Sequence, residues 1–426
     1  MGAIGRILGT HCLVGVLCLA TAPAHAQTPS PAATPQPSAA SDENDDGQLD
    51  ERPKKRSQKD DLPGWHYASR GLQFRSSEGR FFQWFTFRNQ FRVSSPFDGT
   101  PTEPEDIPVD GEGNTELVVN RSRVKFGGHL GTPRVQNFVE IDVKNQRMYH
   151  FFVTVQANRW LDVRVGQWKV EFNRERVDSS GDQQFVDRSI VNNDFTLDGQ
   201  WGAMARGRLF RGHAADSSYF LGVFAGEGRL TTNDDSTPMV LGRYQWNLLR
   251  RSVGFSQSDV EYSPEAAATI GIAAVRGRGR HTRYDSSGGA NLDGFSTGEP
   301  GQYELRQWMV DFAFFRRGFS AQGEQHSKKV IDHLQGGQLT LHGGYLQAGF
   351  FPVRGWSRAL SSLELAGRLA YVDPDAAVDG RNRQEYSGAI NWYFNQHRNK
   401  TSFDISRLVV ESTAGLRIRL QWDLSL

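Results

Sequence analysis

Basic side chains are the residues of this 426-residue chain whose type and spacing could do chemistry. Of its 49 Lys and Arg residues, nine are Lys and forty are Arg. Arginine carries a planar, permanently charged fork of donors that matches phosphate and carboxylate. One polar stretch contains Lys169, Arg174, Arg176 and Arg188. Six more lie at alternating positions of strand-like segments, namely Arg88, Arg92, Arg121, Arg123, Lys125 and Arg164. Facing a narrow aqueous lumen, such side chains would attract anions and hold phosphate bidentately.

Acidic residues in the same segments offer a second interpretation. Those of the polar stretch are Glu171, Glu175, Asp178, Asp182 and Asp187, and Glu140 and Asp142 share the polar face of a strand. If these residues line a lumen, pairing between acids and bases would produce a field across it instead of an excess of positive charge. The residues therefore leave three interpretations open, which are mild anion preference, general diffusion and true phosphate selectivity.

The sequence favours no enzyme, cofactor or metal site. Its eleven His residues show no HExxH motif or paired spacing, so a zinc site has no support. Ser320 and His326 could be imagined as a hydrolase pair on a barrel exterior, but nothing marks a third member. Both cysteines, Cys12 and Cys18, lie in the N-terminal segment. We therefore expect a mature chain without disulfides or Cys-bound metal.

An Arg-Gly-Arg-Gly-Arg run at 276–280 resembles an RNA-binding segment. In an exported chain it is better interpreted as an exposed outer loop that touches the phosphates of lipopolysaccharide. Its glycines do not join a strand to a helix, so a nucleotide site is not indicated. No nucleic-acid partner is expected.

The last eleven residues reveal the element type that would position these side chains. Leu416, Ile418, Leu420, Trp422, Leu424 and Leu426 alternate strictly with Arg417, Arg419, Gln421, Asp423 and Ser425. Successive side chains of a strand point to opposite faces, so one face here is apolar and the other polar. About 9–11 residues let a tilted strand cross a bilayer. A terminal apolar strand is typical of outer-membrane barrels, although their usual last residue is aromatic.

Connection lengths suggest how such strands are arranged. The polar stretches 94–116 and 169–198 are long, whereas 131–134, 158–160 and 395–400 are tight. Long outer loops and short periplasmic turns alternate in outer-membrane barrels, and the long stretches here follow odd-numbered strands. At roughly 20–25 residues per strand and connection, the remaining chain holds about 14–18 strands, a range that leaves an aqueous channel. We predict an all-β transmembrane antiparallel barrel of sixteen strands, with one loop folded into the pore.

The N-terminus has the features of a secretory signal. Arg6 precedes an apolar stretch at 13–22 and an Ala-His-Ala cleavage site at 24–26. We predict a signal peptide at 1–26, a disordered periplasmic linker at 27–61 and the barrel at 62–426. The linker is rich in Pro, Ala, Ser and charge, and cannot bury a core. The predicted location is the outer membrane of a Gram-negative bacterium.

Several motifs together resemble the phosphate-selective porin O and P family. They are Gly-Gln-Trp-Lys-Val-Glu-Phe at 166–172, Phe-Val-Asp-Arg-Ser at 185–189, Gly-Gly-Tyr-Leu-Gln-Ala-Gly-Phe at 343–350, Leu-Glu-Leu-Ala-Gly-Arg at 363–368, Asn-Trp-Tyr-Phe at 391–394 and the closing strand at 417–426. They occur in the family's order and span most of 62–426. The departures are Phe224-Ala225-Gly226 where the family usually has Phe-Asn-Gly, Val170 where it commonly has Pro, and the scarcity of lysine.

The resemblance implies a homotrimer of sixteen-stranded barrels in which the loop after the fifth strand constricts the pore. It also implies passage of phosphate or polyphosphate along an arginine-lined path. We therefore expect a water-filled porin for passive diffusion of small solutes, with preference for anions such as phosphate, in contact with membrane lipid and lipopolysaccharide. The alternative is a structural or adhesive barrel without solute selectivity. Strand number discriminates the two, since sixteen strands leave an open lumen and eight do not.

Overall fold

The computed structural model describes residues 63–68, 71–108, 113–233, 235–285, 288–352 and 360–426. The predicted signal peptide at 1–26 and the predicted linker at 27–61 lie outside the described residues. None of the described helices is long and apolar enough to cross a membrane.

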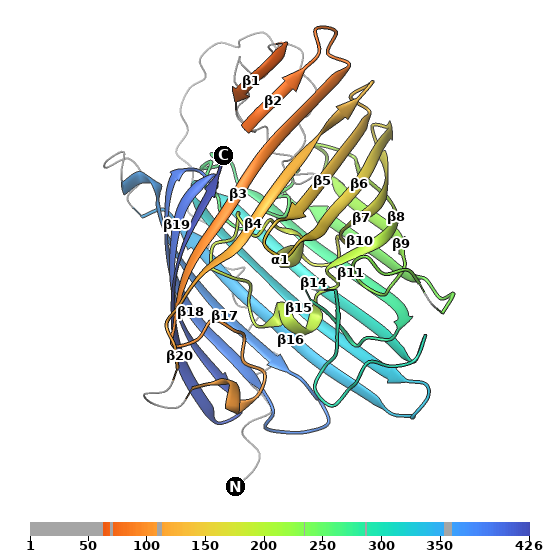
Figure 1. Cartoon of the computed structure of the whole chain (residues 1–426), viewed down its shortest axis with the longest axis vertical. Helices are drawn as coiled ribbons and strands as arrows, with labels where there is room; N and C mark the ends of the chain where they lie inside the picture. Colours follow the sequence, from red (N-terminus) through yellow and green to blue (C-terminus); the bar gives the residue numbers. More distant parts are fainter. Residues whose placement is uncertain (1–62, 69–70, 109–112, 234, 286–287, 353–359) are drawn as a thin grey trace. The chain divides into compact units, whose positions relative to one another are not determined.

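A closed antiparallel barrel forms the body of the molecule (Figure 1). The main sheet has 18 strands, of which β1 and β2 form a separate hairpin and the other sixteen form the wall. The wall strands are β3 (Phe81–Ser95), β4 (Glu116–Leu130), β5 (Val135–Asp142), β6 (Arg147–Asn158), β7 (Leu161–Lys169), β8 (Gly199–Leu209), β9 (Ser217–Phe224), β10 (Met239–Asn247), β11 (Ala267–Gly279), β14 (Tyr303–Arg316), β15 (Phe319–Asp332), β16 (Gln338–Phe350), β17 (Leu363–Asp373), β18 (Arg383–Asn395), β19 (Asn399–Val410) and β20 (Thr413–Ser425). Strand β20 pairs back with β3, from Ile418 opposite Ser95 to Ser425 opposite Arg88, so no edge remains in the wall. The prediction of sixteen strands is confirmed.

The two faces of the wall follow the alternation in the sequence. In β20, Leu416, Ile418 and Leu420 are exposed on the outside, whereas Arg417 and Arg419 are buried inside. The same phase places polar residues inside along the other long strands. An Arg on a lipid-facing position at mid-bilayer costs about 2–4 kcal/mol, which explains why the Arg-rich face turns inward.

Connections at the two ends of the barrel differ in length. The end that holds the C-terminus has the short turns 131–134, 159–160, 317–318 and 396–398, and the opposite end has the long loops 96–115, 170–198 and 280–302. Short turns mark the periplasmic end of such barrels and long loops the extracellular end. The clearest exception is the connection 248–266, which joins β10 to β11 at the periplasmic end and is as long as an outer loop.

A hairpin of β1 (Gly64–Ala68) and β2 (Gly71–Arg75) extends the wall beyond its closure (Figure 1). Strand β2 pairs with the start of β3, from Leu72 opposite Phe85, whereas β20 pairs with the later part of β3. Leu426 closes the ladder between them: its N–H donates to the Phe87 carbonyl at 2.9 Å, and its own carbonyl accepts from the Phe87 N–H at 3.1 Å. Strands β2 and β20 therefore pair with successive parts of β3, one after the other.

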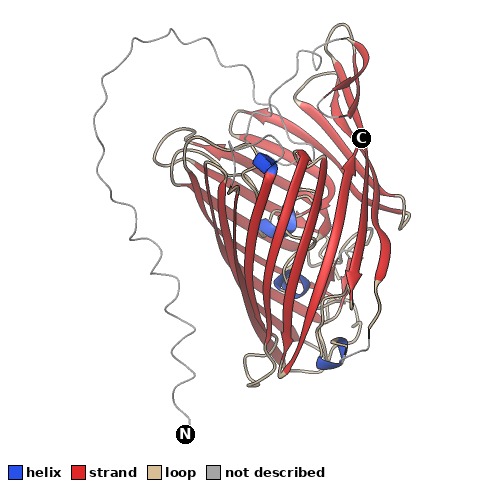
Figure 2. Cartoon of the chain, turned by 90° about the vertical axis from the view of Figure 1, so that its left-hand side faces the viewer, coloured by secondary structure: helices blue, strands red, loops and turns tan. Residues whose placement is uncertain are grey.

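Residues 170–198, called the lumen loop below, fold into the barrel with α1 (Arg174–Val177) and α2 (Val191–Phe195). Figure 2 shows short helices behind the strands of the wall. Phe172, Val177 and Phe195 of this loop are fully buried and belong to the main apolar cluster. The remaining small elements are η2 (Pro104–Asp106), η3 (Leu360–Ser362), β12 (Arg283–Asp285) and β13 (Gly288–Ala290). The loop after the fifth wall strand therefore lies where the sequence predicts it.

Candidate functional site

The lumen loop is held by the wall through its backbone. Its N–H groups donate to wall carboxylates, Glu175 to Glu324 at 2.6 Å, Val186 to Asp404 at 3.0 Å and Ile190 to Glu385 at 3.0 Å. Its carbonyls accept from wall side chains, including Lys400 and Arg368. A backbone segment away from water must find hydrogen-bond partners, and here charged wall residues supply them. The loop is thus positioned on several sides of the barrel at once.

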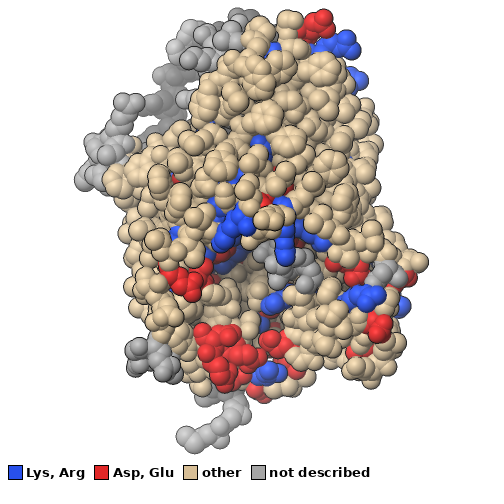
Figure 3. Space-filling model, in the orientation of Figure 1, with Lys and Arg blue, Asp and Glu red and all other residues tan. Residues whose placement is uncertain are grey.

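All ten predicted basic residues lie inside the barrel. Nine are buried, and Arg121 is partly buried. Figure 3 shows Lys and Arg side chains gathered across the middle of one face, with Asp and Glu gathered below them. The strand alternation and the inward lumen loop together place these residues on one side of the wall.

Several of the ten residues contact carboxylates. Arg88 pairs with Asp423 at 2.8 Å, Arg123 with Glu140 at 2.6 Å, and Arg164 with Glu171 at 3.2 Å. Arg176 pairs with Asp198, and Lys125 lies opposite Glu140 in the strand register. Removing one partner of a buried pair is costly, because the other charge is left without compensation. Each of these lumen charges is therefore compensated by its partner, and removing either partner should destabilise the fold.

Asp187 at the tip of the lumen loop joins two wall arginines. Its carboxylate lies 3.1 Å from Arg92 and 3.7 Å from Arg121, and its side chain is 32% exposed. Burial alone would raise the pKa of Asp187, but Arg121 and Arg92 hold that pKa well below its usual value. Arg92 also contacts Asp98 of the first outer loop at 3.1 Å. The aspartate is ionised at neutral pH and offsets part of the positive charge around it.

Other lumen cations bind backbone oxygens. Arg188 donates to the carbonyls of Glu175 and Asp178 at 2.9 and 2.8 Å, and Lys169 donates to the carbonyl of Asp178 at 3.2 Å. The guanidinium of Arg174 is fully buried and forms no hydrogen bond with any described residue; it faces the ring of Phe255 at 5.6 Å. Carbonyl oxygens do not cancel a full positive charge as a carboxylate does, so positive charge remains at Arg174 and Arg188.

The ten predicted basic residues leave out several inward arginines of the later strands. Arg368 forms a two-pronged contact with Glu385 and donates to the Asp187 carbonyl at 3.0 Å. Arg419 contacts Asp404 with two hydrogen bonds of 3.0 and 2.8 Å. Both arginines occupy the polar phase of an alternating strand. The pattern that identifies the basic residues of the early strands could therefore have found them as well.

The periplasmic segment, residues 248–266, also folds inward and meets the lumen loop. Its Gln257 accepts from the Gln184 N–H of the loop and from the Gln347 amide of the wall, both at 3.1 Å. Ser258 donates to Glu364 at 2.7 Å. Phe255 is buried beside Arg174. The lumen is therefore narrowed from both ends, and no periodic signal in the sequence predicts the second narrowing.

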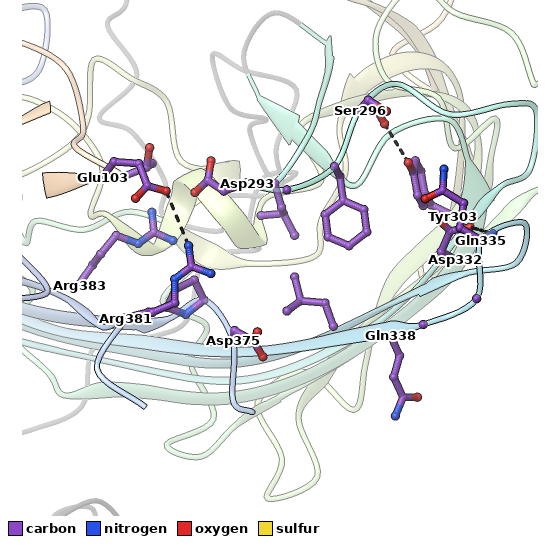
Figure 4. Close-up of a pocket in the computed structure, with 18 of the residues that line it drawn as sticks. Glu103, Asp293, Ser296, Tyr303, Asp332, Gln335, Gln338, Asp375, Arg381 and Arg383 are labelled. Atoms are coloured by element: carbon purple, nitrogen blue, oxygen red, sulfur yellow. Dashed lines mark hydrogen bonds and ion pairs between the residues drawn. The ribbon is translucent and has the colours of Figure 1, made fainter. Parts of the chain in front are cut away.

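At the extracellular mouth lies a cavity of about 360 Å³ between the outer loops. Its lining carries Glu103, Asp293 and Asp375 together with Arg381 and Arg383 (Figure 4). Burial raises the pKa of Glu103, and the nearby Asp293 raises it further. Acidic residues therefore outnumber basic ones in the lining of this cavity.

The two residues imagined as a hydrolase pair lie elsewhere than expected. Ser320 and His326 are fully buried inside the barrel instead of on its exterior. Ser320 accepts from Gln184 at 2.8 Å, and His326 contacts Glu324 at 2.9 Å. Ser320 thus holds the wall to the lumen loop, and His326 does so by packing against the rings of Phe172 and Phe195. The described residues contain no cluster of His, Cys, Asp and Glu that could hold a metal ion.

The Arg-Gly run at 276–280 was expected to be an outer loop, and that expectation is wrong for most of it. Strand β11 continues to Gly279, because the run pairs with β14, with Arg276 opposite Arg306. Gly277 and Gly279 face inward, and Arg276 faces outward. The glycines are therefore strand positions whose missing side chains leave room for Met239 and Glu227.

Residues 134–406 match the family described as phosphate-selective porin O and P. A loop-deletion variant of OmpT, an outer membrane protein of Vibrio cholerae, aligns with a TM-score of 0.53 and 9% identity over 81% of this chain and 99% of that one. OmpF of Salmonella typhi, solved with daunomycin, aligns with a TM-score of 0.50 and 7% identity over 82% of this chain and 98% of that one. At these identities the likeness concerns the fold. No curated protein matches in sequence.

Proposed function

Because this chain belongs to the phosphate-selective porin O and P family, we propose that small anions, phosphate among them, diffuse passively through its lumen. The family and the sixteen-stranded barrel are those of outer-membrane channels and not of enzymes. The anion preference is the finer part of the proposal. This preference depends on the net charge of the side chains that a solute passes beside the lumen loop.

One observation carries the anion preference: several lumen cations donate their hydrogen bonds to backbone carbonyls or to no described partner. Arg188 belongs to this group, as does Arg174. Arg417 joins them, since it donates to the carbonyls of Asp98 and Gly99. Their charge is not cancelled at contact distance, so it remains available to a passing anion. Rings of such charges select anions in pores.

General diffusion is the second candidate function. It is favoured by the carboxylate partners of Arg88, Arg123 and Arg164, which leave those three residues with little net charge. The structural or adhesive alternative is disfavoured by the strand number, because sixteen strands enclose far more interior than eight. Selectivity and not permeation therefore separates the two main candidates.

The remaining parts of the proposal follow from the family and the sequence. We propose export by the signal at 1–26, a tether at 27–61, a homotrimeric assembly, and contact of the outer wall with membrane lipid and lipopolysaccharide. An exposed apolar band that includes Ile272, Trp308 and Val310 suits a lipid environment.

A planar-bilayer measurement tests the proposed function. Purified protein in a KCl gradient should produce ohmic current steps with a reversal potential that favours chloride, and added inorganic phosphate should reduce the chloride current. Arg174→Gln and Arg188→Gln should each lower the chloride-to-potassium permeability ratio. Arg80→Gln is the matched control, because Arg80 is an exposed arginine in the turn between β2 and β3, away from both segments that fold into the lumen. Absence of conductance would contradict the channel, and cation preference would contradict the anion proposal.

A further inference from the structure

A cluster of arginines lies on the outside of the barrel at its extracellular rim. Arg276 and Arg278 end β11, and Arg306 begins β14, with Arg276 and Arg306 directly opposite each other in the register. Their side chains are 65%, 37% and 53% exposed. They share the outward phase of Ile272 and Trp308, so they face the membrane side of the wall. We call these three residues the rim arginines.

One buried carboxylate organises the rim arginines. Glu304 is 1% exposed and accepts from the Nε atoms of Arg276 and Arg306 at 2.8 and 2.7 Å. Arg278 lies 3.6 Å from the same carboxylate, and the His333 ring lies 2.9 Å from it. Like charges directly opposite each other in a sheet are destabilising, so this carboxylate is needed to hold the pair. Three guanidinium groups around one carboxylate still leave a surplus of two positive charges.

The terminal guanidinium nitrogens of the pair are unused. Only the Nε atoms of Arg276 and Arg306 form hydrogen bonds with described residues. The Nη atoms therefore project from a fixed base with no acceptor among those residues. Arginine forks in this arrangement match the oxygens of a phosphate group, with two parallel hydrogen bonds per fork. Lys329, opposite Arg306 on β15, adds another positive charge beside them.

The height of the cluster identifies the surface that it meets. Directly below the rim arginines along the same strands lie the exposed apolar residues Ile272, Trp308 and Val310. A basic residue on the lipid face costs about 2–4 kcal/mol at mid-bilayer and about 0–1 kcal/mol near the interface, so the arginines must lie at head-group level. Both strand ends lead into the long loop 280–302, which places them at the outer leaflet.

We propose that the rim arginines bind a phosphate of a phosphorylated glycolipid of the outer leaflet, the lipid A part of lipopolysaccharide. The surplus charge and free Nη donors meet the phosphate, and the acyl chains lie along the apolar residues beneath. This inference rests on the outer-membrane placement in the proposed function and is independent of solute selectivity. It gives the Arg-Gly run at 276–280 a membrane-facing role.

Binding of lipid A to the purified full-length chain in detergent, followed by native mass spectrometry, tests the inference. Bisphosphorylated lipid A should bind at least five-fold more tightly than its fully dephosphorylated form. The double variant R276Q/R306Q should lose that difference, and R276K/R306K should keep part of it, since Lys retains the charge without the fork. R80Q/R251Q is the matched control, because it removes two exposed arginines that pair with Glu78 and Glu265 elsewhere.

Four results would overturn the inference, three of them from lipid A itself. Those three are equal binding of both lipid A forms, unchanged binding by R276Q/R306Q, and complete competition by millimolar inorganic phosphate, which would show a site for the free ion. Phosphatidylglycerol binding as tightly as lipid A would also reject the glycolipid. Heat-modifiable migration on gels reports whether each variant is folded, and R276K/R306K serves if R276Q/R306Q is not. A protein that binds lipid A but conducts no current would refute the proposed channel alone.

Discussion

Neutralising Asp187 should increase the anion preference of the channel. Asp187 is the only carboxylate within 4 Å of Arg121 among the described residues, and it also contacts Arg92. Asp187→Asn keeps the shape of the side chain and its capacity to accept hydrogen bonds, but removes one negative charge. Arg121 then has no carboxylate partner among the described residues and keeps its full attraction for a passing anion, whereas Arg92 retains, of its carboxylate contacts, only that with Asp98.

The size of the effect follows from the distances. Two unit charges about 4 Å apart interact with roughly 1 kcal/mol in bulk water, and this value is a lower bound for the partly buried Asp187 side chain, which is 32% exposed. A permeating anion should therefore be favoured by at least about 1 kcal/mol, or about five-fold, in the variant. The Debye length falls from about 10 Å at 0.1 M salt to about 3 Å at 1 M, so the gain should shrink at high salt.

Reversal potentials in a KCl gradient, recorded at low and high total salt, measure this change. Glu78→Gln is the matched control. It removes the same charge from an exposed acid in the turn between β2 and β3, far from the lumen loop. A chloride-to-potassium ratio that stays constant or falls at low salt would refute the reasoning. It would mean that permeating ions do not pass Asp187.

Three further results are expected. Burial, with Glu324 nearby, raises the pKa of Glu175 to about 7 against the opposing effect of Arg368. Acidification from pH 8 to pH 6 therefore removes a negative charge from the lumen loop and should raise the chloride-to-potassium permeability ratio. Glu175→Gln should abolish that pH dependence, and a ratio that falls on acidification would contradict the prediction. Replacing 251–264 with a short Gly-Ser turn should increase single-channel conductance, because the periplasmic segment contacts the lumen loop through Gln257, and an unchanged conductance would show that the segment leaves the path clear. Leu420→Arg, on the outer face of β20, should destabilise the folded barrel by about 2–4 kcal/mol in lipid, whereas Leu420→Phe should be tolerated. Urea titration followed by gel migration measures the free energy of unfolding of both variants.

Much of the candidate site could be predicted from local pattern. The phase of an alternating strand assigns each side chain to one of two faces, so the pattern alone was enough to place Arg88, Arg123 and Arg164 in the lumen. The long stretch after the fifth strand could likewise be recognised as the lumen loop from its length. The family resemblance rested on motifs in the same stretch and is confirmed by the match over 134–406.

Charge partners could not be predicted in this way. Arg88 meets Asp423 across 335 positions of sequence, because barrel closure brings the first and last wall strands together. The inward fold of 248–266 was equally hidden, since Phe255 and Gln257 are buried by contacts with the lumen loop and with β16 and not by a repeat of their own. The same holds for Glu304, whose role depends on three arginines from two strands.

The sequence by itself determined the kind of wall: a strand has a period of two, and alternating residues must therefore sort into an apolar exterior and a polar interior. Only the tertiary structure decided which lumen charges are cancelled. Electrostatic interactions depend on distances of a few ångströms. Those distances are set by closure of the barrel and by the two segments that fold into it, and no local pattern records them.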